Sequence, residues 1–420
     1  MQIRKISAYE IIASGGYPSL EVQVELESGV VGVASVPYGV SAGSHEATVL
    51  VDGDEHRYHG KGMLTAIASV NQEIAPHIIG LDAQDQEHID TTMIQLDGTP
   101  QKSRLGGNAI LAVSMACARA AAGALKKPLY KHIADTYTTQ PNLDNLPQPM
   151  AVVIEGGKHA DSSTDLQEFC FSVLKQGSRA ESVRMMLESY HALEHILHQN
   201  HLSTNVGNEG AFAPSGIPSN EAPLQYMYAA IQAAGYTPGV DIGFSIDAAA
   251  NEFYKDGKYV LRMENRSVSA AELLAYIESW MTKYPIITLE DPLAEDDWQN
   301  WVIAKQMCDT HQVKLIGDDL TVTNTLRLQK AIDLQAISSI LIKLNQIGSL
   351  SETVACCKLA QQHGLTTVPS HRGGGETNDT AMVDLAVAVG ASFIKVGPSR
   401  GERVAKYNRL LEIERELRQR

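Results

Sequence analysis

The sequence has 420 residues, which is too long for a single small hydrophobic core. The length therefore predicts one large domain and a smaller one. Apolar residues make up 44% and charged residues 20%, which is typical of a soluble globular protein. The formal net charge of −15 is not offset by any basic stripe, and this excludes a nucleic-acid-binding face.

Three features predict a cytoplasmic protein without a membrane span. No apolar run approaches the roughly 18 residues that a membrane helix needs. The first residues, MQIRKISAYEII, lack the apolar stretch and cleavage site of a signal peptide. The five cysteines form no CxxC pair, which indicates free thiols in a reducing compartment and argues against a zinc cluster.

The first third of the chain has the pattern of an α+β domain. Residues 20–36 contain two alternating runs around a Ser-Gly turn, which predict a β-hairpin. Residues 103–124 are rich in alanine and helical in period, which suits a closely packed helix. The stretch LPQPM, at 146–150, then breaks the pattern. We therefore expect a smaller α+β domain at residues 1–137 and a larger domain at residues 138–420.

The larger domain has the repeating pattern of a (β/α)8 barrel, whose typical length is roughly 250 residues. Short apolar runs recur at intervals that leave room for one helix each, and most end in a charged or imidazole side chain. These side chains belong to Asp247, Glu290, Asp318, Lys343, His371 and Lys395. Because the carboxyl ends of parallel barrel strands meet at one mouth, we expect the six residues to converge on an active site.

Each of the six residues has an ordinary structural explanation when it is considered alone. An aspartate after a strand is most often a helix cap or a turn former, and a lone histidine is most often a structural residue. The regular repetition favours a shared site over six separate structural roles.

The three carboxylates of this set, Asp247, Glu290 and Asp318, would repel one another on neighbouring strands without a cation. A hard divalent ion resolves the repulsion. Three oxygen ligands, with the other positions left to water and substrate, suit Mg²⁺, whereas zinc more often recruits histidine or cysteine.

Lysines and further acids complete the predicted chemistry. Lys343 and Lys395 follow on later strands, and Glu168 and Glu209 precede the three carboxylates. A lysine close to other cations can act as a base. Acids on one side, lysines on the other and a metal between them suit the removal of a proton next to a carboxylate, with the ene-diolate stabilised by the positive charges.

Several segments resemble one known family in sequence and in order. ITLEDPLAEDDW, IGDDLTVTN, LIKLNQIGSLSET and PSHRGGGETNDT resemble barrel motifs of the enolases, the phosphopyruvate hydratases of glycolysis. DGDEHRYHGKGM and LGGNAILAVSMACARAAA resemble enolase N-terminal segments, and the resemblance runs from about residue 5 to the C-terminus. It implies an α/β fold, with a smaller N-terminal α+β domain and a C-terminal (β/α)8-type barrel of the enolase kind. In that kind, the first strands and helices depart from strict alternation.

The resemblance implies a lyase that interconverts 2-phosphoglycerate and phosphoenolpyruvate with loss of water, using two Mg²⁺ ions. Asp247, Glu290 and Asp318 match the ligands of the first ion. Ser41 matches a serine on a mobile loop that helps to hold the second ion, which binds only with substrate.

The same comparison implies roles for the catalytic side chains. Lys343 matches the base that takes the proton from carbon 2, and Glu209, with Glu168 beside it, matches the acid that assists loss of the 3-hydroxyl. Lys395 matches a lysine near the substrate carboxylate and hydroxyl. His371 matches a pocket histidine and is placed with the catalytic residues. The substrate contacts implied besides Lys395 are His159, Gln167, Arg372 and Gly373.

The loop SHRGGGET departs from the family's usual SHRSGET by one added residue. By resemblance it contacts phosphate, because Arg372 can make paired hydrogen bonds to phosphate and nearby glycines allow close backbone approach. Gly373 or Gly374 stands where the family has a serine. If this glycine marks specialisation, Gly373→Ser is expected to improve the use of 2-phosphoglycerate.

Other departures lie in neighbouring substrate loops. The first-loop motif SGASTG is YGVSAG here, with Tyr38 as a bulky addition, and SRGNPT is SGGYPS, with Gly15 in place of an arginine. GDEGG is GNEGA, which places Asn208 beside Glu209, and HAGG is HADS, which adds Asp161.

Three functions therefore remain open. The first is an enolase with drifted loops, and the second is a paralogue that acts on a related phospho- or phosphono-carboxylate. The third is a non-catalytic, enolase-like binding protein. In each case we expect a small phosphorylated carboxylate as the ligand and a homodimer or higher homo-oligomer, with no nucleic-acid partner.

Overall fold

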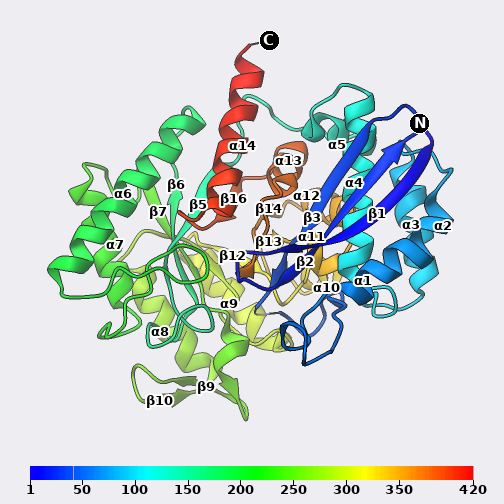
Figure 1. Cartoon of the computed structure of the whole chain (residues 1–420). Coiled ribbons are helices and arrows are strands. Elements are labelled where there is room, and N and C mark those ends of the chain that lie inside the picture. The colour runs from blue at the N-terminus through cyan, green and yellow to red at the C-terminus, as the bar shows by residue number, and fades with distance from the viewer. Residues whose placement is uncertain (41, 420) are drawn as a thin grey trace.

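The computed structural model describes residues 1–40 and 42–419, which form an N-terminal domain beside a barrel (Figure 1). The N-terminal domain has an antiparallel sheet with the strand order β1-β2-β3. Its strands are β1 (Ile3–Ile12), β2 (Pro18–Leu26) and β3 (Val31–Val36). The alternation in β2 puts Leu20, Val22 and Val24 on the buried face, and the hairpin expected at residues 20–36 is confirmed.

The alanine-rich segment forms α4 (Gly107–Ala124), which packs against β2 and β3. The approach is close, since a Cβ on Gly32 of β3 would lie 2.2 Å from the Ala116 carbonyl oxygen. By length and composition α4 is apolar enough to cross a membrane, so the expectation that no segment reaches that length is wrong. It is the one such helix among the described residues, and most of it is buried inside the domain.

The remaining helices of this domain lie beside α4 and the sheet. They are α1 (Leu64–Ala68), a π-helical turn η2 (Ser69–Ile74), α2 (Ala75–Ile78), α3 (Gln86–Asp97) and α5 (Leu129–Tyr137), with a short 3-10 turn η1 (Tyr58–Gly60) before them.

The larger domain is a barrel of eight strands in the order β14-β13-β12-β11-β7-β6-β5-β16. A parallel bridge between Ser370 and Lys395 closes it at the β14–β16 edge. The strands are β5 (Gln148–Glu155), β6 (Glu168–Val173), β7 (Ile242–Asp247), β11 (Ile286–Glu290), β12 (Lys314–Gly317), β13 (Ser339–Ile342), β14 (Thr366–Pro369) and β16 (Phe393–Val396).

Strand β6 runs antiparallel to both of its neighbours, β5 and β7. This is the departure from strict β/α alternation that the family resemblance implied. It has a direct consequence for the site: Glu168, the first residue of β6, pairs with Glu155 and Asp247, the last residues of β5 and β7. An acid at the start of a strand therefore reaches the mouth where the other strands end.

Helices cover the outside of the barrel, and α14, red in Figure 1, ends near the C-terminus. They are α6 (Arg179–Gln199), α7 (Ala222–Ala233), α8 (Ala270–Met281), α9 (Trp298–Thr310), α10 (Thr325–Asp333), α11 (Leu344–Ile347), α12 (Leu350–Gln362), α13 (Ala381–Ala388) and α14 (Gly401–Arg418). A 3-10 turn η3 (Ala250–Phe253) leads into a small sheet of β8 (Tyr254–Lys255), β9 (Lys258–Leu261) and β10 (Arg266–Val268).

The barrel interior is a packed core below the mouth. A separate apolar cluster includes Met150, Val152, Cys170, Ile316 and Leu341, which come from four strands. This rigid floor fixes the strand ends above it, and the polar side chains at those ends are held accordingly.

Candidate active site

The structure brings the six strand-end residues to one end of the barrel. Asp247 and Glu290 are the last residues of β7 and β11, and Asp318 directly follows β12. Lys343 directly follows β13, and Lys395 lies in β16. His371 comes two residues after the end of β14.

Lys395 is the centre of a buried carboxylate cluster. Its Nζ lies 2.7 Å from both Glu290 oxygens, 3.1 Å from Asp247 Oδ2 and 2.8 Å from Glu168 Oε2. Burial disfavours the ammonium, but the three carboxylates outweigh it and raise the pKa of Lys395 well above its usual range. Burial, together with the charge of Asp247, raises the pKa of Glu290 well above its usual range. The carboxylates of this cluster therefore converge on a position that favours a cation.

Asp318 belongs to a neighbouring pair. Lys343 Nζ donates to one of its oxygens, and Gln346 Nε2 donates to the other at 2.8 Å. Burial alone would raise the pKa of Asp318, but the Lys343 ammonium outweighs it and holds the pKa below the usual value. Asp318 likewise raises the pKa of Lys343 against the effect of burial.

Two further acids and two histidines face this cluster. His371 Nε2 lies 3.1 Å from Glu209 Oε1, and His159 Nδ1 lies 3.7 Å from the same oxygen and 3.4 Å from Glu168 Oε1. Burial disfavours the Glu209 carboxylate, but the two histidines outweigh it and lower its pKa. Burial and the charge of Glu209 raise the pKa of Glu168 to about 8. Two carboxyl groups with pKa values pushed apart are the usual signature of separate acid–base roles.

The ring of His371 is oriented by Arg403, which sequence reasoning missed. Arg403 Nε donates to His371 Nδ1 at 3.3 Å, and the backbone N–H of Gly397 approaches the same nitrogen at 3.4 Å. A nitrogen that accepts two donors carries no proton, so the proton of the neutral ring lies on Nε2 and points toward Glu209.

Several buried polar atoms at the mouth make no hydrogen bond within the described part of the chain. They include Gln167 Oε1, His159 Nε2 and Glu209 Oε2. Buried polar atoms are normally satisfied, so this group of atoms indicates a polar ligand at the mouth.

The predicted phosphate contact Arg372 is held by an internal carboxylate. Its Nη1 donates to Glu46 at 2.9 and 3.0 Å, and both side chains are buried. Glu46 also accepts from Gln346 Nε2 at 3.3 Å, which links it to Asp318. Sequence reasoning missed Glu46, although its place directly after the first-loop motif was a usable signal.

The GGG loop pairs with the first loop. Gly374 and Gly375 form β15 (Gly374–Gly375), which is antiparallel to β4 (Tyr38–Gly39). A Cβ on Gly15 would lie 2.4 Å from the Gly374 carbonyl oxygen and 3.5 Å from the Tyr38 hydroxyl. Three of the five segments that depart from the family pattern are therefore in contact with one another. Ser41, the predicted ligand of a second ion, lies outside the described residues.

Comparison with known families covers nearly the whole chain. Residues 3–133 match the family model for the enolase N-terminal domain, and residues 144–420 match the model for the enolase C-terminal TIM barrel domain. The chain belongs to the enolase family.

Members of the enolase family are lyases that generally bind Mg²⁺, and the chemistry of the predicted ligands suits that ion. Among the described residues, the acidic group whose oxygens lie within 4.8 Å of one another joins Asp318 to Asp291 and Asp319 rather than to Asp247 and Glu290. Asp247, Glu290 and Asp318 supply only oxygen atoms, from the ends of the adjacent strands β7, β11 and β12. The ammonium groups of Lys395 and Lys343 now neutralise the carboxylates that would hold a hard cation.

The enolase chain also uses two aspartates that sequence reasoning missed. Asp291 accepts the backbone N–H groups of Asp318 at 2.9 Å and of Asp319 at 2.7 Å, so it fixes the turn that carries the proposed ligand. Burial and the neighbouring Asp318 raise the pKa of Asp319 to about 8. The doubled acids in LED and GDD were the available sequence signal.

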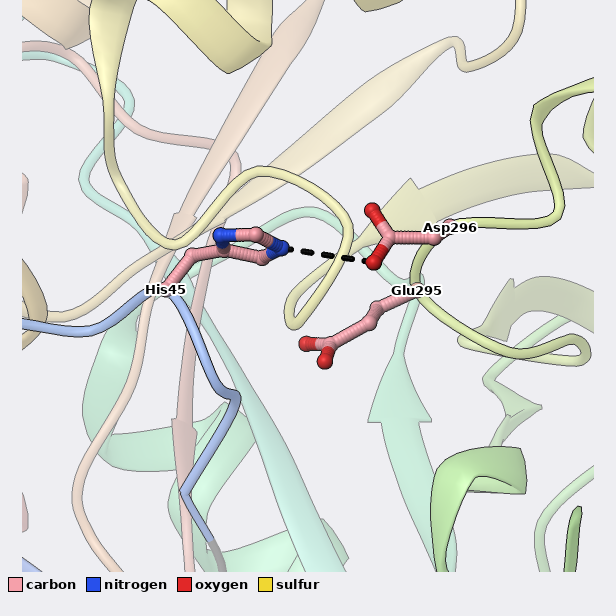
Figure 2. Close-up of side chains that lie close together, drawn as sticks. All are labelled: His45, Glu295 and Asp296. Carbon is pink, nitrogen blue, oxygen red and sulfur yellow. Dashed lines mark hydrogen bonds and ion pairs between the residues drawn. The ribbon is translucent and has the colours of Figure 1, made fainter.

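The first loop is tied to the rim of the barrel by a second cluster, which Figure 2 shows. His45 Nε2 lies 3.4 Å from Asp296 Oδ2, and Glu295 is beside them. Glu295 accepts from the Ser44 hydroxyl at 2.5 Å and from the Ser44 N–H at 3.2 Å. These contacts hold the segment that leads to Glu46 against the loop after β11.

The surroundings of Gly373 lead us to expect the opposite of the improvement that the sequence suggested for Gly373→Ser. A Cβ at Gly373 would lie 2.6 Å from His159 Nε2 and 2.9 Å from Glu209 Oε1. We expect Gly373→Ser to lower lyase activity by about tenfold or more, because a shift of one ångström at such a site costs up to about 10² in rate. Turnover measured beside Gly401→Ser checks this, because nothing lies within 4 Å of a Cβ at Gly401. Equal activity of Gly373→Ser and Gly401→Ser would show that the loop at Gly373 shifts to accommodate the added side chain.

Proposed function

We propose that this enolase-family chain is a Mg²⁺-dependent lyase that interconverts 2-phosphoglycerate and phosphoenolpyruvate. The observation that carries the proposal is a continuous series of polar contacts around the barrel mouth. Lys343 contacts Asp318, which Gln346 links to Glu46 and Arg372.

The series continues on the other side of the mouth. Arg403 donates to the Arg372 carbonyl oxygen at 2.9 Å and to His371, which faces Glu209. His159 then lies between Glu209 and Glu168, and Glu168 pairs with Lys395. The proposed base, acids, phosphate contact and metal ligands thus form one connected site.

The proposed reaction removes a proton and a hydroxyl group from adjacent carbons. Lys343 acts in its neutral form, which Asp318 disfavours until a bound Mg²⁺ would take over that carboxylate. It takes the proton from carbon 2, and the electron pair left behind forms the carbon–carbon double bond as the 3-hydroxyl leaves. Glu209 and Glu168 act on that hydroxyl together: Glu168, whose pKa is raised to about 8, keeps a proton near neutral pH and gives it to the hydroxyl, which the ionised Glu209 orients, so the products are phosphoenolpyruvate and water. Bound Mg²⁺ would neutralise the charge that develops on the substrate carboxylate.

The remaining side chains bind and orient the substrate. Arg372 would exchange its pairing with Glu46 for the substrate phosphate, to which an arginine can make two parallel hydrogen bonds. Lys395, at the centre of the carboxylates, would contact the substrate carboxylate and hydroxyl. The near-complete burial of His371, Glu209 and Lys395 excludes water from the proposed reaction.

A second candidate function rests on the contacts between the altered loops. β4, β15 and Gly15 lie together beside Arg372, and a Cβ on Gly39 would lie 1.8 Å from Arg372 Nη2. Three segments that depart from the family pattern therefore lie together at the phosphate end of the proposed site. This favours, as the alternative, a paralogue that acts on a related phospho- or phosphono-carboxylate.

A substrate comparison separates the two candidates. We expect the pure protein with Mg²⁺ to convert 2-phosphoglycerate with a higher kcat/KM than its analogue in which CH₂ replaces the bridging phosphate oxygen. A higher value for the phosphonate would favour the paralogue. Metal-dependent binding of both compounds without conversion of either would instead indicate the non-catalytic function.

A further inference from the structure

Glu155 is a buried acid that none of the proposed roles uses. It is the last residue of β5 and is 0% exposed. Its Oε1 accepts the backbone N–H of Glu209 at 3.2 Å and that of Ala211 at 3.2 Å, and its Oε2 lies 3.3 Å from the same Glu209 nitrogen. A barrel strand thus holds, through one side chain, the loop that carries Glu209.

The rest of that loop is held through its carbonyl groups. Arg400 donates to the Gly207 carbonyl oxygen at 3.2 Å, and Ser399 and Tyr190 donate to that of Gly210 at 2.7 and 2.8 Å. Within the described part of the chain, Glu155 is the acceptor found for the N–H groups of Glu209 and Ala211. Loss of the Glu155 carboxyl group would leave the backbone N–H groups of Glu209 and Ala211 without this acceptor and free that part of the loop to move.

The loop is also shaped around the Glu155 carboxyl group. A Cβ on Gly207 would lie 2.5 Å from Glu155 Cδ and 2.7 Å from its Oε1, so the backbone can approach the carboxyl group only where a glycine stands. The backbone N–H of Glu155 donates to the Phe212 carbonyl oxygen at 2.9 Å, which fixes the far end of the same loop.

We propose that Glu155 is a positioning residue for the lyase reaction, because its carboxyl group fixes the backbone of Glu209 and so sets the direction of that side chain. The inference rests on the proposed function. Carboxyl oxygens of Glu155 and Glu209 and a ring nitrogen of His159 lie within 4.8 Å of one another, so the Glu155 carboxyl group is close to the Glu209 side chain as well as to its backbone.

The charges around Glu155 favour its neutral form. Burial and the carboxylate of Glu209 raise the pKa of Glu155 to about 9; Glu168 acts in the same direction, and Arg403 opposes it. Near neutral pH Glu155 therefore keeps its proton and adds no negative charge beside Glu209. As the pH rises through about 9, the ionised Glu155 would add a negative charge beside the Glu209 carboxylate and repel an anionic substrate.

Two substitutions separate positioning from mere stability. Glu155→Gln keeps an oxygen that can accept both N–H groups and stays neutral at every pH. We expect kcat of this variant to stay within about threefold of the wild-type value near neutral pH. Above about pH 9, where Glu155 of the wild type ionises, we expect kcat of the variant to fall less steeply than that of the wild type. Glu155→Ala removes both hydrogen bonds, and we expect kcat to fall about 10–100-fold, with KM changed by less than about threefold.

Hydrogen exchange supplies a readout independent of turnover. The amides of Glu209 and Ala211 are expected to exchange faster in Glu155→Ala and at the wild-type rate in Glu155→Gln. Asp97→Ala is the matched control, because Asp97 is a buried acid that accepts backbone N–H groups of Thr99, Arg104 and Leu105 in the other domain. It is expected to lower Tm without changing kcat or its pH profile.

The outcomes are distinct. Wild-type kcat and pH dependence in Glu155→Ala, with only a lower Tm, would overturn the inference. So would an equal loss of kcat in the alanine and glutamine variants. If the wild type does not convert 2-phosphoglycerate, the proposed function fails, and amide exchange alone decides whether Glu155 positions Glu209. Faster exchange of the Glu209 and Ala211 amides in the alanine variant would then support this positioning, and unchanged exchange would overturn it.

Discussion

Replacement of Lys343 by alanine is expected to abolish lyase turnover while Mg²⁺ binding is retained. Lys343 lies at the end of β13, and its Nζ contacts one oxygen of Asp318. Loss of a general base typically costs about 10²–10⁴ in rate, so we expect at least about a hundredfold loss. Asp318 keeps its hydrogen bond from Gln346 in the variant, so its orientation for an ion is preserved.

The decisive measurement for this variant is exchange of the carbon-2 hydrogen of 2-phosphoglycerate with deuterium from solvent. Calorimetric Mg²⁺ titration of the same protein serves as the binding control. Lys305→Ala is a suitable second control, since Lys305 forms a surface pair with Asp309 within one helix. Exchange that continues at the wild-type rate in Lys343→Ala would remove Lys343 as the base.

Replacement of Lys395 by methionine is expected to cause the largest loss of stability. The substitution removes the ammonium that lies among the Glu168, Asp247 and Glu290 carboxylates and leaves these acids buried together. Breaking a buried ion pair by removing one partner typically costs about 3–5 kcal/mol. Chemical denaturation in a metal-free buffer measures the change in the free energy of unfolding.

Mg²⁺ provides the internal test of this expectation. An ion held by the same carboxylates neutralises them again, so Mg²⁺ is expected to recover part of the lost stability of Lys395→Met. Lys305→Met is the matched control and should change the free energy of unfolding by about 1 kcal/mol or less, because its partner is exposed. A Lys395→Met protein as stable as the wild type without metal would contradict the cluster described here.

The barrel was predictable because its signal is local. Each of the runs ending at Asp247, Glu290 and Asp318 is a short buried strand, and strand ends follow directly from where the apolar residues stop. The antiparallel direction of β6 has no such local signal, since a buried strand has the same apolar pattern whether it runs parallel or antiparallel to its neighbours. Only the family resemblance implied it, and without it Glu168 would have been placed at the wrong end of the barrel.

The contacts that complete the site were not predictable from the sequence. Glu46 and Arg372 are 326 residues apart, and nothing local to either one indicates the other. The same holds for Glu155 and Arg403, which act on Glu209 and His371 from other elements. The expectation for Gly373→Ser changes for a related reason, because the space beside a glycine depends on side chains far away in the chain, here His159.

The most direct test of the proposed function is the rate at which the wild-type protein forms phosphoenolpyruvate from 2-phosphoglycerate, with Mg²⁺ and after its removal by a chelator. The connected contacts from Lys343 to Lys395 predict turnover that is lost with the metal and returns when Mg²⁺ is restored. Failure to form phosphoenolpyruvate, in a folded protein that still binds Mg²⁺, would contradict the proposed reaction and point to a substrate altered at its phosphate end.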